Sequence, residues 1–156
     1  DVTYATRAFD RSLALIDSSI AINPDYLWAY WLRGVLRLER GRPGDALADA
    51  ERAINVDGAA ALRIAAIVAS GDTTRARAAA GPWLPPHAEG GWTGSLAALA
   101  LGDTAWALEH LERIPPLQRD AQRWLQLRSP FFDALRDNPR FQRVYRDARP
   151  AGARSP

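Results

Sequence analysis

The side chains that most often perform catalysis or bind metals are sparse in this sequence. It contains two histidines, no cysteine and no lysine, since every basic residue is an arginine. Lysine-dependent Schiff-base and P-loop chemistry is therefore excluded, as are thiolate nucleophiles, disulfides and cysteine-bound metals. No nucleophile can be paired with a neighbouring base from the spacing. The sequence predicts no catalytic residues, and we expect that the chain is not an enzyme.

The two histidines are isolated from each other. His87 lies in a proline- and glycine-rich segment, and His110 lies on an expected helix over residues 104–113. A helical metal pair needs a second ligand three or four residues away, and neither histidine has a histidine partner there. We therefore predict that both are solvated at the surface and that the chain holds no metal and no cofactor. The carboxylates of Asp45 and Asp49 are interpreted in the same way, as exposed helix charges.

The elements that would carry these residues are helices. Alanine and leucine fill windows such as residues 46–53 and 95–101, and this composition favours helix over strand. No uninterrupted apolar run approaches the roughly 20 residues that a membrane-spanning helix needs. The sequence predicts an all-α protein with no membrane insertion.

An internal repeat organises these helices. Two apolar residues and one turn-forming residue have counterparts 34 positions later. Ile20, Ile22 and Pro24 align with Ile54, Val56 and Gly58. Further along the spacing shortens, but a glycine is each time followed five residues later by an alanine, at Gly41 and Ala46, Gly71 and Ala76, and Gly102 and Ala107. Two short helices with their turns consume about 34 residues, so the pattern predicts helix hairpins in tandem.

The stretch 27–58 resembles a tetratricopeptide repeat. Its characteristic positions are occupied by Tyr30, Gly34, Gly41, Ala46 and Ala53, with Gly58 in place of the usual terminal proline. The resemblance implies a right-handed superhelix of antiparallel helix hairpins. We expect a single domain, 1–156, that is a fragment of a longer chain. The resemblance divides it into a half repeat 7–26, a full repeat 27–58, degenerate hairpins 59–81 and 91–114, a C-terminal cap 117–148 and a disordered tail 149–156.

The segment SPFFDALRDNPRFQRVY supplies the expected cap. Ser129-Pro130 and Asn138-Pro139 each place an N-cap residue before a proline, so two short helices should begin there. With the preceding hairpin, this segment is similar to the C-terminal end of tetratricopeptide regions in large bacterial signalling proteins, where it follows a serine/threonine kinase, winged-helix or nucleotide cyclase domain. The resemblance implies a sensory or regulatory region in the bacterial cytoplasm or periplasm.

The tetratricopeptide register also indicates which residues would line a concave groove. These positions are occupied by Trp28, Trp31, Val35 and Leu38 in the full repeat and by Trp92 and Leu96 in the last hairpin. Large aromatic side chains on such a surface suit the capture of a peptide, a partner segment or another part of the parent chain. The alternative reading is that the tryptophans pack against neighbouring repeats or the C-terminal segment.

Three classes of function remain open from the sequence. The first is a non-catalytic scaffold or protein–protein interaction module that uses the groove. The second is a structural subunit or tail that docks by its outer surfaces, and the third is a small-ligand sensor. A nucleic-acid partner is disfavoured, because aspartates interrupt the basic stripe formed by Arg136, Arg140, Arg143 and Arg146. The identity of the partner and the oligomeric state are not predicted.

Overall fold

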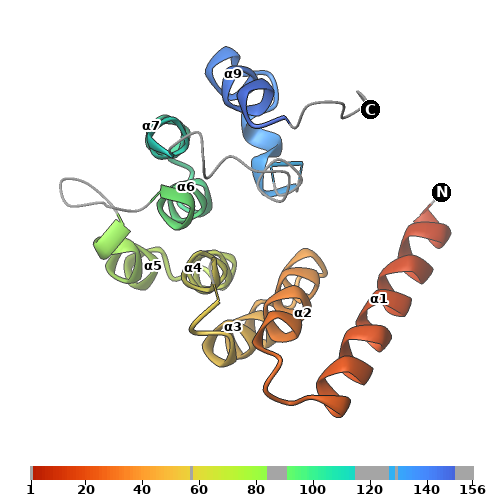
Figure 1. Ribbon diagram of the computed structural model, residues 1–156. Helices are drawn as coiled ribbons and strands as arrows, with labels where there is room; N and C mark the ends of the chain where they lie inside the picture. The colour runs from red at the N-terminus through yellow and green to blue at the C-terminus, as the bar shows by residue number, and fades with distance from the viewer. Residues whose placement is uncertain (1, 57, 84–90, 115–126, 129, 150–156) are drawn as a thin grey trace. The chain divides into compact units, whose positions relative to one another are not determined.

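A computed structural model describes residues 2–56, 58–83, 91–114, 127–128 and 130–149, and these residues form helices and turns with no β-strand. The prediction of an all-α protein is confirmed. Contacts divide the chain into two compact units, Asp1–Ala80 and Gly81–Pro156. Figure 1 labels the helices of both units.

The first unit is a row of five helices in which each packs against the next along the chain. They are α1 (Val2–Ile22), α2 (Leu27–Glu39), α3 (Pro43–Arg52), α4 (Ala59–Ala69) and α5 (Thr73–Ala80). Helix α2 also contacts α4, so first helices of successive hairpins touch each other as well as their own partners. Figure 1 shows α2 and α3 side by side, followed by α4 and α5.

The second unit contains one further hairpin and a C-terminal segment packed against it. Its elements are the 3₁₀ turn η1 (Gly81–Trp83), α6 (Gly91–Ala100), α7 (Thr104–Arg113), the 3₁₀ helix η3 (Pro130–Leu135) and α9 (Pro139–Asp147). Helix α7 packs against α6 and α9, and α6 also contacts both 3₁₀ elements. The helix expected after Ser129-Pro130 is a 3₁₀ helix, while Ser129 itself lies outside the described residues.

The three hairpin turns share one backbone design. Gly41, Gly71 and Gly102 end the first helix of each hairpin with positive φ values of 69°, 87° and 79°, a conformation that only glycine adopts without strain. The residue after each glycine donates its N–H to a carbonyl five positions back, in the bonds Arg42 to Arg37, Asp72 to Ile67 and Asp103 to Ala98. This is the Schellman arrangement that satisfies the last carbonyls of a helix. The turn glycines predicted from the sequence are confirmed.

Small residues let the helices of each hairpin approach closely. Ala46, Ala76 and Ala107, each five residues after a turn glycine, have no exposed surface. On the facing helix of the first hairpin, a Cβ added to Gly34 would lie 3.3 Å from the Ala46 carbonyl oxygen and 2.7 Å from Leu62 Cδ2. A larger side chain at these positions would force the helices apart. The repeated alanines are therefore core residues.

Two of the expected helix caps form. The Asp103 carboxylate accepts a hydrogen bond from the Trp106 backbone N–H at 3.0 Å, so α7 begins where the sequence indicates. The Asn138 side chain accepts from the Arg140 N–H at 2.9 Å, with Pro139 at the first helical position of α9. Both side chains satisfy an N–H group that has no partner within its own helix.

The C-terminal segment adds an aromatic cluster to the second unit. Phe132 and Phe141 are buried and stack with their ring centroids 5.7 Å apart, and Tyr145 continues the stack at 6.4 Å from Phe141. A bidentate ion pair joins α9 to α7, because Arg140 Nε and Nη2 lie 2.9 and 2.6 Å from the two Glu112 carboxylate oxygens. One arginine of the predicted basic stripe is thus paired with an acidic residue of the preceding hairpin.

Candidate functional site

The four groove residues predicted in the first unit share one face of α2, at intervals of three, four and three residues. All of them are partly buried: Trp28, Trp31, Val35 and Leu38. The rings of Trp28 and Trp31 meet edge to face, with centroids 5.4 Å apart and planes at 78°. The edge-to-face contact holds the two rings in a defined orientation. One side of α2 therefore presents a continuous aromatic and aliphatic stripe.

The tryptophans of this stripe also contact the core. Together with Leu27 and Tyr30, they pack against the turn from α3 to α4, where Ala53, Val56 and Ala59 are buried. The indole Nε1 of Trp31 is shielded from solvent and has no hydrogen-bond acceptor among the described residues. Both residues remain partly exposed, so each contacts the core and also reaches the surface of the unit.

The other two predicted groove residues belong to the second unit. Trp92 is partly buried and packs against Phe132, with ring centroids 5.2 Å apart and an angle of 45° between the planes. Leu96, four residues later on α6, is only 5% exposed and is a core residue. Of this pair, Trp92 contacts the C-terminal segment, which was the alternative considered for the tryptophans. The structure thus brings four of the six residues together in one stripe and holds the remaining two in the other unit.

A charge cluster on α2 was not anticipated. Arg33 donates from Nε and Nη2 to the Asp49 carboxylate, at 2.7–3.2 Å, and from Nη1 to Asp17 at 2.7 Å. Arg37 donates to the second oxygen of Asp49 at 2.8 Å. A single guanidinium therefore ties α2 to both α1 and α3. Hydrogen bonding to the Asp49 carboxylate, which accepts from the guanidinium, is the main cause that raises the pKa of Arg33 above its ordinary value.

The prediction that Asp49 is an exposed charge is wrong. Its side chain is 4% exposed, whereas Asp45, one turn earlier on α3, is 47% exposed and pairs with Arg42. A buried carboxylate is tolerated when cations and donors surround it, and Arg33 with Arg37 provides both. The sequence spacing indicates this cluster. Asp17 lies 16 residues before Arg33 and Asp49 lies 16 residues after it, which in this repeat is the separation of facing positions on neighbouring helices.

The prediction that His110 is solvated at the surface is also wrong. The residue has no exposed surface on α7. Its Nε2 lies 3.1 Å from the carbonyl oxygen of Trp83, and the Trp106 ring meets it edge to face at 5.0 Å. Nδ1 is buried and has no partner among the described residues. This arrangement fits a neutral imidazole that donates Nε2–H to Trp83 and keeps Nδ1 unprotonated. The other histidine, His87, lies outside the described residues.

Burial of His110 depends on a glycine in the facing helix. A Cβ at Gly94 would lie 2.7–2.9 Å from three atoms of the imidazole ring, closer than van der Waals contact allows. Ser95, the next residue, is also fully buried and its hydroxyl has no partner among the described residues. The close approach of α6 to α7 therefore leaves room for an imidazole only because position 94 lacks a side chain.

We predict that this histidine makes the second unit less stable at mildly acidic pH. Desolvation by burial lowers the pKa of His110 below 6.5, and the nearby Arg113 adds to this, while the bond to Trp83 and the Glu109 carboxylate oppose it. Below pH 6.5 the unfolded chain therefore binds a proton that the folded unit does not, so the free energy of unfolding falls as pH drops towards the lowered pKa. Amide hydrogen exchange of α6 and α7 at pH 7.5 and 5.5, corrected for intrinsic rates, measures this loss.

Two variants make that measurement specific. His110→Gln should flatten the difference between the two pH values, because the amide does not titrate. His87→Gln should leave it unchanged and serves as the matched control. An unchanged pH dependence in His110→Gln would show that another group causes it.

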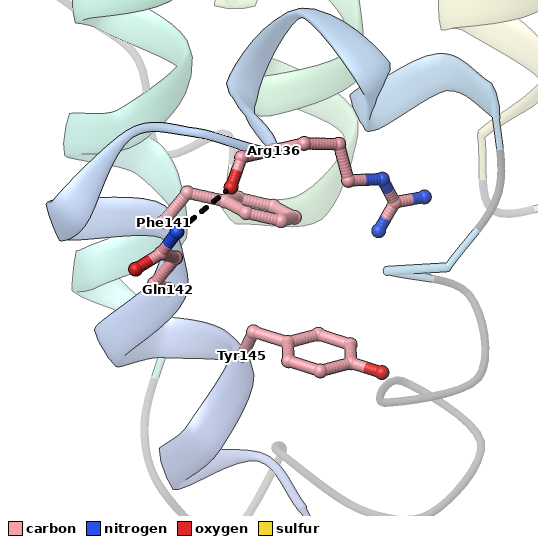
Figure 2. A pocket seen from close by; sticks show the side chains of 4 residues that line it. All are labelled: Arg136, Phe141, Gln142 and Tyr145. Atoms are coloured by element: carbon pink, nitrogen blue, oxygen red, sulfur yellow. Dashed lines mark hydrogen bonds between the residues drawn. The ribbon is translucent and has the colours of Figure 1, made fainter. Parts of the chain in front are cut away.

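A small pocket lies in the C-terminal segment. Its volume is about 240 Å³, and Arg136, Phe141, Gln142 and Tyr145 line it, as Figure 2 shows. The Arg136 guanidinium lies 5.9 Å from the Phe141 ring centroid and donates to the Leu127 carbonyl at 2.9 Å. Pockets for drug-sized ligands typically enclose about 300–1,000 Å³, so this one is below that range. Its arginine is already engaged with the protein.

Two further features are not found among the described residues. No described helix has the length and apolar character that would let it cross a membrane. No group of three or more histidine, aspartate or glutamate side chains is placed to hold a metal ion within the described ranges. Comparisons with protein-family models, curated proteins and solved structures give no match to this chain.

Proposed function

We propose that this chain is a non-catalytic interaction module of the tetratricopeptide type, in which helix hairpins form a right-handed superhelix. Support comes from the three Schellman turns, which recur at nearly equal spacing, and from the buried alanine that follows each of them. Repeats of this kind leave an extended surface that binds other proteins rather than a closed catalytic cavity. Its proposed context is a regulatory region of a bacterial signalling protein, as the resemblance of the C-terminal segment implies.

The stripe on α2 is the observation that carries the proposed binding activity. Trp28 and Trp31 pack against the core cluster Ala53, Val56 and Ala59, and they are still partly exposed. Aromatic residues that are rigid before binding lose little conformational entropy when a partner covers them, and such residues dominate interface energies. The expected occupant is an extended or helical peptide segment with apolar side chains that contact both rings.

A second candidate function is supported by a different set of residues. Several large apolar side chains of the first unit are exposed, among them Leu15 at 65%, Ile22 at 85% and Ile54 at 70%. None of these lies in the stripe on α2. A structural subunit that docks through its outer surfaces would cover residues such as these. The two functions therefore predict different contact residues on the same unit.

Peptides selected from a random display library against the full chain would test the proposal. If the stripe is the binding site, Trp31→Ala should weaken the selected peptides at least about 10-fold, and Ile54→Ala should change affinity less than about 2-fold. Val35→Glu is a second variant on the same face that keeps both tryptophans. Its circular dichroism melting curve and that of Trp31→Ala establish that the folded unit is being compared.

The competing outcome is equally specific. If Ile54→Ala or Leu15→Ala lowers the affinity for the peptides while both variants in the stripe bind normally, the result supports docking by the outer surface and contradicts binding at the stripe. Tryptophan fluorescence of the chain that does not change when a peptide binds would lead to the same conclusion.

A further inference from the structure

Helix α1 carries apolar residues on two opposite sides. The side that packs against α2 holds four partly buried residues at intervals of three and four: Phe9, Leu13, Ile16 and Ile20. On the other side Leu15 and Ile22 are 65% and 85% exposed. A helix that is apolar on all sides is normally covered on all sides, yet α1 lies at the edge of the first unit (Figure 1). Its outer face is therefore left uncovered by the described residues of the unit.

The outer face is defined by five exposed residues that follow the helical period: Ala14, Leu15, Ser18, Ala21 and Ile22. None of them is charged. The Ser18 hydroxyl donates to the Ala14 carbonyl at 2.8 Å, so it needs no partner from outside and can be covered by apolar groups. Apart from Ser18, the face has only aliphatic side chains. A surface of this kind suits an apolar helix rather than a charged ligand.

The order of residues on the outer face is self-complementary. If two copies of α1 pack antiparallel with Ser18 at their crossing point, each residue faces the one that lies equally far on the other side of Ser18 in the second copy. Ile22, four residues after Ser18, then faces Ala14, four residues before it. Leu15 and Ala21, each three residues from Ser18, face each other in the same manner. Each large side chain thus meets a small one, which lets the two backbones approach without overpacking.

Two charged residues extend the same symmetry. Arg11 lies seven residues before Ser18, and Asp25 lies seven residues after it, in the turn that follows α1. Both are exposed, and neither has an ion-pair partner among the described residues. The acidic residues of α1 itself, by contrast, are engaged by arginines of the unit: Asp10 with Arg40 and Asp17 with Arg33. In the antiparallel pair, Arg11 of each copy faces Asp25 of the other.

We propose that the outer face of α1 binds α1 of a second copy of this chain, antiparallel, with a two-fold axis at Ser18. Complementary charge and size identify this occupant, since a parallel pair would oppose Arg11 to Arg11 and Leu15 to Leu15. The face spans about 17 Å from Arg11 to Ile22, and a contact of one helix is smaller than a standard interface of about 1,600 Å². The dimer should therefore dissociate on dilution. It does not use the stripe on α2, so its failure would leave the proposed binding function untouched.

Disulfide cross-linking tests the axis and the orientation together. The chain contains no cysteine, so a single substitution reports on one position. Ser18→Cys should form a covalent dimer under mild oxidation at least about 10-fold faster than Ser70→Cys, because the pair holds the two sulfur atoms together. Ser70 is a matched control, since it is exposed and its hydroxyl also donates to the carbonyl four residues before it.

Ala14→Cys controls for the register of the pair. It lies on the outer face, but in the antiparallel pair the two copies of this position are about 12 Å apart along the helices. A disulfide joins Cα atoms only about 4.4–6.8 Å apart, so Ala14→Cys should cross-link no faster than Ser70→Cys. Rapid cross-linking of both Ala14→Cys and Ser18→Cys would indicate a parallel pair. Equal rates for all three variants would show that the face does not meet a second copy. Either result overturns the proposal.

Sedimentation equilibrium of the full chain at low ionic strength, up to about 1 mM, tests the charge pairing. Arg11→Asp should weaken dimerisation about 10-fold, because it brings two acidic residues together at each end, and adding Asp25→Arg should restore it to within about 3-fold. Ile22→Glu should abolish dimerisation, whereas Ile54→Glu, at a residue 70% exposed outside α1, should leave it unchanged. Failure of the second charge swap to rescue the first, or loss of the dimer in Ile54→Glu, would contradict the proposed pair. A chain that stays monomeric would assign the face to a different protein and would also overturn it.

Discussion

Asp49→Asn is expected to lower the free energy of unfolding of the first unit by about 3 kcal/mol, because removal of one partner from a buried ion pair leaves the other charges uncompensated. Asp49 is 4% exposed, and it is the shared acceptor of Arg33 and Arg37. Asparagine keeps the size of the side chain but loses the negative charge, so the two guanidinium groups face each other without a carboxylate between them. The loss should extend to α1, because Arg33 also holds Asp17.

Amide hydrogen exchange of α2 and α3 measures this effect within the first unit, since it reports local opening free energies segment by segment. The matched control is Asp45→Asn on the same helix. Asp45 pairs with Arg42 across one turn and both side chains are about half exposed, so its loss should change stability by less than about 0.5 kcal/mol. Equal effects of the two substitutions would contradict a structural role for the buried cluster.

The helices and their turns are the part of the fold that local sequence determines. A glycine is required where the backbone takes a positive φ, as at Gly41, and Asp103 and Asn138 accept the first free N–H groups of their helices. These are interactions between residues close in the chain, so the spacing of residue types is sufficient to predict them. The all-α class follows from the same local signals.

The errors concern burial, which depends on the neighbouring helix. On its own helix, each of Asp49 and His110 has the polar character of a surface residue. What buries them lies elsewhere: Arg33 on α2 neutralises Asp49, and Gly94 on α6 leaves the space for His110. Aligning the repeats on their turn glycines would have superposed the two sites. The information on burial therefore lies in pairs of positions on facing helices, rather than in single positions.

The site prediction shows the same limit. The 3.6-residue period of a helix places Trp28, Trp31, Val35 and Leu38 on one face, and the structure has them there. Whether a residue on such a face is a surface or a core residue depends on how far the next helix covers it. Leu96 is almost completely covered, whereas the stripe on α2 is covered only in part. Single-helix periodicity contains no information on that coverage.

Gly94→Ala is expected to lower the free energy of unfolding of the second unit by about 2 kcal/mol, although alanine favours helix over glycine. The new methyl group would lie 2.7–2.9 Å from three ring atoms of His110. The imidazole cannot move away freely, because it is fully buried, bonded to the Trp83 carbonyl and flanked by the Trp106 ring. Overpacking against a rigid ring therefore outweighs the gain in helix propensity.

A double-mutant cycle separates the clash from every other effect of the methyl group. In the His110→Ala background the ring is absent, so Gly94→Ala should become neutral or stabilising by up to about 1 kcal/mol, which is the ordinary difference between glycine and alanine in a helix. Gly44→Ala provides the control for propensity alone, since an added Cβ at Gly44 on α3 meets no atom within 4 Å. Urea unfolding or hydrogen exchange of α6 and α7 gives the four free energies. If Gly94→Ala destabilises equally with and without the ring, the close packing of His110 on Gly94 does not determine how α6 and α7 approach. A positive coupling would instead show that the contact of the His110 ring with Gly94 determines how closely α6 and α7 approach.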